Sequence, residues 1–303
     1  MGFSQLVDVT YLILLHNNSQ TLPALAESIK SMDNNFKSEY LIIDDASSDD
    51  TKTVAQQLFS KLPRVTILAN SIYSGPAFSI NDVIHLIQGR YVHFVIGGDI
   101  LSPNSTSELI KACEVMGTSL AFGLKGKLDD YGIKNPSEYE TSDISIIDRP
   151  IANILEGKIP GINDVGNSGT LVEYDLLDKI SGIDSMVFLH NTSLALRCAK
   201  HSKFASVKRT LYYTSQNHIS EYNKKFQTTD YLSAVARFME GNPEIAECYK
   251  PEIYKSLWSK IWSLDKYKVR TLPRYLLSRY INRNLDCSTL IDTYRSYIAE
   301  LEV

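Results

Sequence analysis

The chain has 303 residues, of which 44% are hydrophobic and 22% charged, the composition of a folded globular protein and not of a disordered one. Its formal net charge of −4 argues against a nucleic-acid partner, because such proteins present a strongly basic surface. The four cysteines are widely scattered, with no pair at metal-ligand or redox spacing, which favours a reducing compartment. The first apolar run is too short for a signal peptide or a membrane-spanning helix, so we expect a cytoplasmic protein.

Short apolar runs alternate with amphipathic segments over the first hundred residues. The expected strands span 8–15, 40–44, 65–69 and 91–96, and the expected helices span 22–32, 51–62 and 77–87. This alternation predicts right-handed βαβ units and a mostly parallel sheet. Ligands bind beyond the carboxyl ends of the strands in such sheets, so we expect a site in the loops that follow the strands.

The pattern changes in the second half of the chain. Short strands are expected at 120–124, 168–174, 204–208 and 210–214, and they predict a mixed extension of the sheet that would hold an acceptor. After Asn217 the sequence becomes helical and rich in Tyr, Trp, Lys and Arg. We therefore expect a first domain over 1–217 and a helical, basic and aromatic C-terminal region over 218–303.

Two adjacent carboxylates end the second expected strand. Asp44 and Asp45 stand in LIIDDASSDDT, residues 41–51, where a small-residue turn leads into a helix. Asp45 can accept hydrogen bonds from a base imide or from a ribose hydroxyl. The alternative is that both residues only cap the turn and the helix, which is a common use of Asp.

The chain resembles the family-2 glycosyltransferases in a series of motifs that follow one another in the correct order. Typical members read V-I-I-P-x-Y-N, then L-x-x-x-L-x-S, then V-D-D-G-S-x-D-x-T, and later G-x-x-x-A-R-N followed by A-x-G-E-Y-I. In this chain His16 takes the aromatic place of the first motif, and the matching positions are Asn17, Ser28, Asp44, Asp45, Ser47, Asp49, Thr51, Gly75, Asn81, Gly89 and Tyr91. A weaker match over 167–184 adds Gly182 and Asp184, so the resemblance extends over about residues 8–215.

The resemblance implies a GT-A fold, which is a Rossmann-like, mostly parallel mixed sheet flanked by helices. It also implies a glycosyltransferase that moves a sugar from a nucleotide donor, usually a UDP-sugar, to a hydroxyl of a glycan or lipid-linked saccharide, as in polysaccharide biosynthesis. It places Asn17 near the nucleotide and Asp45 on the base. The full set of predicted nucleotide-binding residues is His16, Asn17, Asp45, Gly75, Asn81, Gly97, Gly98 and Asp99.

The first departure from the family pattern lies at the metal site. Members follow the strand aligned with 91–96 by D-x-D-D, whose acids hold Mn²⁺ or Mg²⁺ on the diphosphate, whereas this chain reads Ile96, Gly97, Gly98 and Asp99. Asp99 is then the one carboxylate in register for a metal, so we predict weak or absent dependence on Mn²⁺ or Mg²⁺. The glycines allow backbone amides to approach the phosphates instead, and the alternative is a tight turn without function.

The second departure lies at the catalytic base. The family pattern E-D-x-D-x-x-x-R, whose first Asp deprotonates the acceptor hydroxyl, meets residues 190–197 of this chain. Asn191 replaces that Asp, and an amide takes up no proton at neutral pH. His190 is the candidate base, against the alternative of a structural histidine, and Arg197 matches the family Arg. A catalytically silent glycosyltransferase-fold protein that binds and supports a partner enzyme is therefore a rival hypothesis.

A basic stretch follows at 250–283. It carries nine Lys or Arg residues against Glu252 and Asp265, a balance of +7, and Trp and Tyr are interleaved among them. This composition suits a peripheral contact at the inner face of an anionic membrane. The alternative is that Leu257, Ile261 and Leu264, which recur at helical spacing, pack on the sheet domain and leave the charges in solvent.

Overall fold

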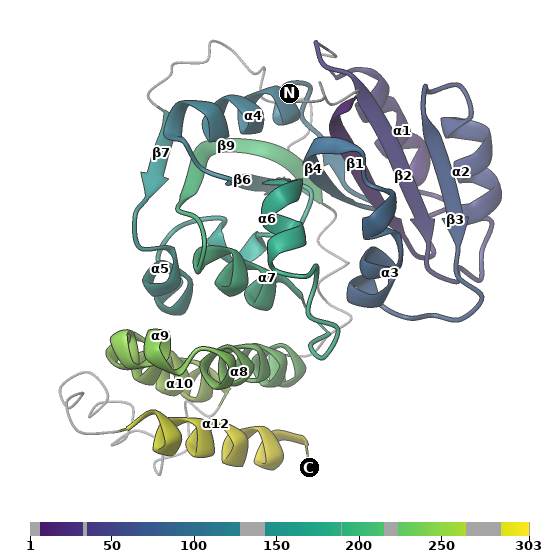
Figure 1. The fold of residues 1–303 in the computed structure, drawn as a ribbon. Helices are drawn as coiled ribbons and strands as arrows, with labels where there is room; N and C mark the ends of the chain where they lie inside the picture. The colour runs from purple at the N-terminus through teal and green to yellow at the C-terminus, as the bar shows by residue number, and fades with distance from the viewer. Residues whose placement is uncertain are drawn as a thin grey trace.

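A mixed β-sheet forms the centre of the computed structural model, which describes residues 7–32, 35–127, 143–188, 190–214, 224–264 and 286–302 (Figure 1). The strands in these ranges are β1 (Val7–Leu15), β2 (Ser38–Asp44), β3 (Val65–Ala69), β4 (Gly89–Ile96), β5 (Ile100–Leu101), β6 (Leu120–Lys127), β7 (Ile144–Ile147), β8 (Thr170–Glu173) and β9 (Phe204–Thr214). The helices before residue 215 are α1 (Leu22–Lys30), α2 (Thr51–Phe59), α3 (Pro76–Val83), α4 (Ser105–Met116), α5 (Pro150–Glu156), α6 (Tyr174–Lys179) and α7 (His190–Ala199), with the short 3-10 helices η1 (Ile84–Leu86) and η4 (Ile162–Asp164).

The sheet has the strand order β3-β2-β1-β4-β8-β6-β9-β5, with β7 paired to β9. The strands β3, β2, β1 and β4 are all parallel, as the alternating sequence pattern predicts. Antiparallel β8 then joins β4 to β6, so the predicted mixed extension is also confirmed. The α/β class predicted from the sequence is therefore correct.

One predicted pair of strands is a single strand. The segments 204–208 and 210–214 form the continuous strand β9, which runs parallel to β6. The pairing shifts register here, because Gly123 pairs with Val207 whereas Leu124 pairs with Thr210. The irregularity accommodates the intervening polar residues Lys208 and Arg209, so a break in the apolar pattern does not end the strand.

Alternate residues of β1 pack into different layers of the molecule. Leu12 and Leu14 contribute to a core that includes α3, α5, α6 and α7, whereas Tyr11 and Ile13 contribute to a core that includes α1, α2 and α4. Eight of the nine residues of β1 are buried, as expected for a central strand with helices on both faces. The sheet is thus a rigid platform whose strand ends carry the polar loops.

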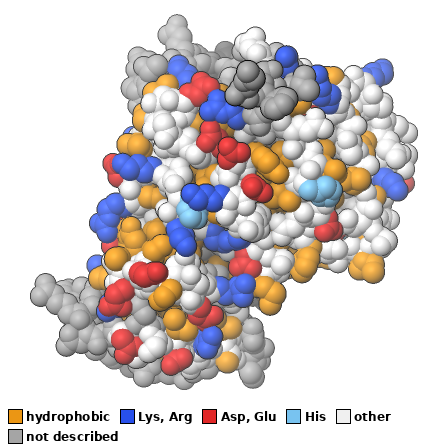
Figure 2. Space-filling view, in the orientation of Figure 1, with side chains coloured by type: hydrophobic (Ala, Val, Ile, Leu, Met, Phe, Trp, Pro, Cys, Tyr) orange, Lys and Arg blue, Asp and Glu red, His pale blue; other side chains and the backbone are white. Residues whose placement is uncertain are grey.

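In the described residues after 223, four helices form a layer against α7, on the side away from α1 and α2 (Figure 1). They are α8 (Lys224–Gly241), α9 (Pro243–Cys248), α10 (Lys250–Leu264) and α12 (Cys287–Glu302). α8 contacts α7 on one side and α12 on the other. Figure 2 shows acidic and basic side chains interspersed on the face in view, not gathered into one basic area.

The basic stretch is described only in part. Within α10, Leu257 and Ile261 are buried in the core, which agrees with the packing interpretation of that segment. The side chain of Leu264 and residues 265–283, the larger part of the proposed membrane contact, lie outside the described residues. In the described ranges no helix combines the length and apolarity that crossing a membrane requires. The division at residue 217 stays a prediction.

Replacing Tyr294 tests how far the C-terminal layer contributes to stability. The Tyr294 side chain is fully buried and its hydroxyl donates to the Ile253 carbonyl at 3.0 Å. We expect Tyr294→Ala to cost about 3–5 kcal/mol of unfolding free energy, because it removes a large buried ring. Thermal unfolding should show a clearly lower midpoint, and Ser296→Ala on the exposed side of α12 should leave it unchanged. Equal midpoints for both variants would contradict the packing of α12.

Candidate functional site

Four loops meet at the carboxyl edge of the parallel strands, where the sequence analysis places the site. The strands end in line, because Leu15 pairs with Asp44, Asp44 pairs with Ala69, and Leu14 pairs with Ile96. The loops that follow are 16–21, 45–50, 70–75 and 97–99. Residues that are distant in the sequence are therefore brought together at one edge of the sheet.

Asn17 joins the loop after β1 to the loop after β2. Its backbone is left-handed, with φ of 52°, a conformation that Asn adopts more readily than most residues. Its Oδ1 accepts a hydrogen bond from the Ser48 backbone N–H at 2.8 Å, and its own N–H donates to Ser47 Oγ at 2.9 Å. Ser47 in turn donates to the Asp44 carboxylate. The two polar loops therefore form one hydrogen-bonded unit.

Asp49 fixes the start of α2. Its carboxylate accepts hydrogen bonds from the Ser19 N–H at 3.1 Å, from the Ser19 hydroxyl at 2.6 Å and from the Thr51 N–H at 3.0 Å. Burial opposes ionisation, but the hydrogen bonds outweigh it and lower the pKa of Asp49 to about 2. This acid of the motif holds the loop after β1 to the helix.

Asp45 organises the loop between β3 and α3. The residue is 1% exposed, and its carboxylate accepts hydrogen bonds from Asn70 Nδ2 at 2.8 Å, from the Ser74 N–H at 3.0 Å and from the Gly75 N–H at 2.8 Å. Gly75, with φ of 82°, then begins α3. Three donors of the chain itself thus surround the carboxylate predicted to receive a base, and that predicted role stays a prediction.

An aromatic pair stands at the rim of the same loops. The imidazole of His16 donates from Nδ1 to the Asp45 carbonyl at 2.7 Å, which fixes its orientation. The Tyr73 ring lies against it, with 4.5 Å between ring centroids and an angle of 46° between planes, and Tyr73 is 45% exposed. Tyr73 matches no family motif, so the sequence analysis missed it. The only sequence signal is an aromatic residue in a short loop before a glycine.

Sterics explain why glycine occupies positions 97 and 98 after β4. The Gly97 N–H donates to the Leu14 carbonyl at 2.7 Å, and a Cβ at Gly97 would lie 2.2 Å from Asn18 Oδ1. Gly98 has φ of 90°, which strongly favours glycine. The turn after β4 therefore passes close to the loop after β1, and no larger side chain fits at Gly97.

Asp99 is buried behind this turn. It is 4% exposed and accepts a hydrogen bond from Ser168 Oγ at 2.6 Å, while Ser168 Oγ accepts from the Ile96 N–H at 2.9 Å. Burial raises the pKa of Asp99 to about 7, although the Ser168 hydrogen bond and the charge of Lys125 work in the opposite direction. The sequence analysis missed Ser168, which comes from a segment 69 residues further along.

A second carboxylate lies on the segment that leads to Ser168. Asp164, at the end of η4, forms an ion pair with Lys125 of β6 at 3.2 Å, and its side chain is 25% exposed. The charge of Asp164 also contributes to the raised pKa of Asp99, so the two carboxylates lie within electrostatic range of each other. The sequence analysis singled out neither Asp164 nor Lys125.

The predicted catalytic residues begin α7. Asn191 Nδ2 donates to the Val165 carbonyl at 2.9 Å and to Asn167 Oδ1 at 3.0 Å. His190 is 4% exposed, its Nε2 lies 3.3 Å from the Gly166 carbonyl oxygen, and burial lowers its pKa, which favours the neutral ring. Both side chains therefore hold the 165–167 segment against α7.

Two other predicted residues hold a different turn. The Arg197 guanidinium donates to the carbonyls of Ile180 and Gly182, the latter at 2.9 Å. Asn81 exchanges two hydrogen bonds of 2.8 Å with the backbone of Ile183. Asn81 and Arg197 thus bind the 180–183 turn with their side chains, whereas the other predicted residues stand in the strand-end loops and at the start of α7.

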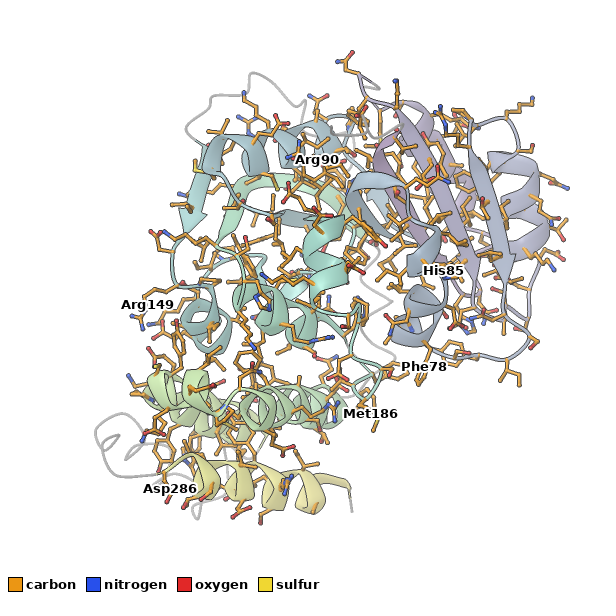
Figure 3. All side chains as sticks on the ribbon, in the orientation of Figure 1. Phe78, His85, Arg90, Arg149, Met186 and Asp286 are labelled. Atoms are coloured by element: carbon orange, nitrogen blue, oxygen red, sulfur yellow. The ribbon has the colours of Figure 1, made fainter. Side chains whose placement is uncertain are left out.

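A small cavity of 250 Å³ opens beside Gly75, between the start of α3 and residues 185–188. Phe78 of α3 and Met186 stand at its mouth and are 50% and 70% exposed (Figure 3). An apolar rim therefore adjoins the strand-end loops on this side.

Residues 10–167 match the model of glycosyl transferase family 2, a span that contains all four strand-end loops. This chain belongs to that family. A curated relative, the succinoglycan biosynthesis protein ExoO of Rhizobium meliloti (strain 1021), is 25% identical over 114 residues. That alignment covers 38% of this glycosyltransferase and 32% of ExoO, about a third of the relative's length.

Solved structures share the fold of this glycosyltransferase. The S. aureus TarS fragment 1-349 has a TM-score of 0.62 and 13% identity, with 89% of this chain and 78% of TarS covered. The mannosyltransferase PcManGT from Pyrobaculum calidifontis, in complex with GDP-Man and Mn²⁺, also has a TM-score of 0.62 and 13% identity, with 100% and 88% covered. The GT-A fold predicted from the motifs is confirmed.

The acids in the described part of this glycosyltransferase do not form a divalent-metal site of the family type. Within the ranges that the structure describes, no group of three His, Cys, Asp or Glu side chains is placed to hold a metal ion. Asp99 is buried and bound to Ser168, and the positions that carry the other family acids are Ile96 and Gly98. A divalent cation beside a diphosphate is held by one or two protein carboxylates, and at the family positions Asp99 is the carboxylate that remains.

Burial of Asp99 predicts a pH-dependent contribution to stability. An ordinary Asp carboxyl has a pKa of 3.8, whereas Asp99 in the folded chain has about 7, so the folded state binds more protons between these values. The free energy of unfolding should therefore fall as pH rises through this window. Asp99→Asn removes the cost of ionisation, and we expect it to stabilise the protein at pH 8 by roughly 2–4 kcal/mol but not at pH 4.

Denaturant unfolding at both pH values measures this difference. The exposed Asp82→Asn on α3 removes the same charge outside the buried cluster and serves as the control. An effect of Asp99→Asn that is the same at pH 4 and pH 8 would contradict the raised pKa.

Proposed function

We propose that this glycosyltransferase moves a sugar from a nucleotide-sugar donor, a UDP-sugar, to a hydroxyl of a glycan or lipid-linked saccharide. The observation that carries the proposal is the convergence of the four strand-end loops with the His16 and Tyr73 rings at their rim. TarS in complex with UDP-GlcNAc and PcManGT in complex with GDP-Man are relatives in fold that support a donor of this class.

The donor base is proposed to lie on the exposed face of Tyr73. Aromatic side chains stack on bases with a contribution of about 1–3 kcal/mol per base. The ring is held by the loop that the Asp45 carboxylate fixes, and His16 supports it from behind through its bond to the Asp45 carbonyl. In this proposal Asp45 acts on the base largely by positioning the 70–75 loop.

The diphosphate is proposed to lie over the Gly97-Gly98 turn. Glycine at both positions lets the backbone come close to a ligand, and backbone N–H groups then donate to phosphate oxygens. The absence of acids at Ile96 and Gly98 supports donor binding with weak or no dependence on a divalent ion. No step of the proposed reaction passes through a metal.

The attacking acceptor hydroxyl loses a proton as it bonds to the sugar carbon and the nucleoside diphosphate departs. Asn191 offers no basic atom, and the buried His190 ring is engaged with the Gly166 carbonyl. Asp164 is a partly exposed carboxylate on the segment that Asn191 holds, and it forms an ion pair with Lys125. We therefore assign Asp164 as the base, with Asn191 and His190 positioning its segment.

The apolar rim beside the strand-end loops supports an acceptor that carries an apolar group. Phe78 and Met186 expose large apolar side chains beside the strand-end loops. An acceptor that carries an apolar group, as a lipid-linked saccharide does, would cover this rim and remove it from water.

Donor binding provides the first test. We expect Tyr73→Ala to weaken UDP-GlcNAc binding by about tenfold, because it removes the stacking surface. Ile72→Ala, at a neighbouring residue that is 75% exposed, is the matched control. Calorimetric titration in EDTA, repeated with Mn²⁺ and with GDP-Man, measures the affinities, and Mn²⁺ should change them by less than about tenfold. Equal affinities for both variants, or binding only with Mn²⁺, would contradict the proposed donor site.

Turnover provides the second test. We expect Asp164→Asn to lower the release of nucleoside diphosphate at least about 100-fold while donor affinity stays unchanged, because the base is lost and the donor site is not. His190→Gln should lower the release of nucleoside diphosphate by a smaller factor. A larger loss of turnover in His190→Gln than in Asp164→Asn would identify His190 as the base instead. Donor binding without turnover in the parent protein, with any acceptor, would favour the silent scaffold.

A further inference from the structure

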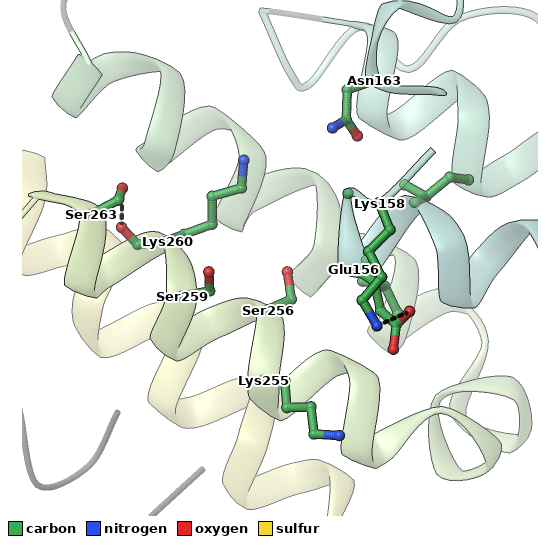
Figure 4. A pocket seen from close by; sticks show the side chains of 11 residues that line it. Glu156, Lys158, Asn163, Lys255, Ser256, Ser259, Lys260 and Ser263 are labelled. Atoms are coloured by element: carbon green, nitrogen blue, oxygen red, sulfur yellow. Dashed lines mark hydrogen bonds and ion pairs between the residues drawn. The ribbon is translucent and has the colours of Figure 1, made fainter. Parts of the chain in front are cut away.

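A larger cavity of 630 Å³ lies between α5 and α10 (Figure 4). One wall is a face of α10 that presents Ser256, Ser259 and Ser263, whose spacing of three and four residues places them on one side of the helix. The buried residues Ile154 and Leu155 of α5 form the apolar part of the lining. The volume is in the range of small-molecule binding sites.

The charge of the cavity is positive. Among the described residues that line it, Lys158, Lys255 and Lys260 stand against one acid, Glu156, which pairs with Lys158 at 3.0 Å. Lys158 keeps 71% of its side chain exposed beside that pair, so its ammonium group remains accessible. Lys260 lies with its Nζ 4.3 Å from the centre of the Tyr231 ring. The Ser256 hydroxyl is bonded to the Tyr231 hydroxyl, and Ser263 Oγ donates to the Lys260 carbonyl at 2.7 Å. The ammonium groups and the Ser259 hydroxyl are therefore the donors suited to an oxyanion, a phosphate or a carboxylate.

The cavity adjoins the candidate catalytic segment. Asn163 lines the cavity, and the next residue is Asp164, which pairs with Lys125. Asn167 accepts the hydrogen bond of Asn191 only four residues after Asn163, so these two points are at most about 14 Å apart. A ligand chain bound in the cavity therefore has its next units close to the place where we assign the base.

From these observations we infer that the cavity between α5 and α10 binds an oxyanion group of the acceptor, a phosphate or a carboxylate on a glycan. The inference rests on the proposed transferase function, because it assigns the occupant to the acceptor. The lysines attract the charged group, Ser259 and Asn163 bind hydroxyls, and the apolar lining contacts the sugar ring. Anionic acceptors are then preferred over neutral ones of equal length.

Removal of two exposed lysines tests the inference. The double variant Lys158→Ser with Lys255→Ser lowers the charge of the cavity, and Lys52→Ser with Lys61→Ser, at exposed residues in and after α2, makes the same change of net charge elsewhere. Calorimetric titration uses a galacturonate oligomer, a hexose 6-phosphate and a neutral glucan oligomer as probes. The first two probes separate carboxylate from phosphate as the preferred group.

We expect at least one anionic probe to bind the parent and the control, and to bind the cavity variant at least about fivefold more weakly at low salt. The difference should shrink as salt rises, because ions screen exposed charges. UDP-GlcNAc should bind all three proteins equally. Anionic probes that bind no better than the neutral glucan, or equally to both variants, would overturn the inference.

Donor binding and vesicle binding separate the cavity assignment from the proposed transferase function and from a membrane contact. If UDP-GlcNAc binds none of the proteins, the proposed function fails, whereas normal donor binding without anion discrimination removes only the cavity assignment. Sedimentation with anionic phospholipid vesicles provides the remaining comparison. If the cavity variant loses vesicle binding and binds both soluble anionic probes as the parent does, the lysines serve a membrane contact and the inference is wrong.

Discussion

The buried carboxylate of Asp45 is the constraint on which the strand-end loops depend. It gathers Asn70, Ser74 and Gly75, and so fixes both the loop after β3 and the start of α3. The carbonyl of the same residue orients His16 from the neighbouring strand. One residue at the end of β2 therefore sets the relative positions of three loops, and the exposed Tyr73 ring is held in place as a result.

The backbone at Gly97 and Gly98 explains why replacing Ile96 and Gly98 by acids would not by itself restore a metal site. A side chain at Gly97 would collide with Asn18, and Gly98 has a left-handed backbone that disfavours any other residue. The family acids belong at Ile96 and Gly98, so an acid at Gly98 would strain a turn that Gly97 brings close to Asn18. Asn17 and Asn18 in turn fix the loop after β1 to the loop after β2 and to the start of α2. The departure from the family motif is thus built into the path of the backbone.

The sequence predicts well whatever depends on local periodicity and on motif order. The parallel strands, the helices between them and the meeting of Asn17, Asp45 and Gly97 at one edge all follow from the alternation of elements. The contacts of Asp99 with Ser168 and of Lys125 with Asp164 do not, because they join segments 69 and 39 residues apart across the mixed half of the sheet. The pattern also predicts two strands where β9 is one, because the polar residues Lys208 and Arg209 mimic a turn.

Because α10 lies apart from the strand-end loops, substitutions on this helix and substitutions in those loops act on different sites. The strand-end loops are fixed by hydrogen bonds among residues 14–99, whereas the wall of serines on α10 belongs to a helix that none of those bonds involves. Substitutions at Ser259 or Lys255 alter the chemistry of the cavity without moving Asp45 or Tyr73. Under the proposed assignment of the cavity, related proteins can diverge in the acceptor that they bind while the strand-end loops stay unchanged.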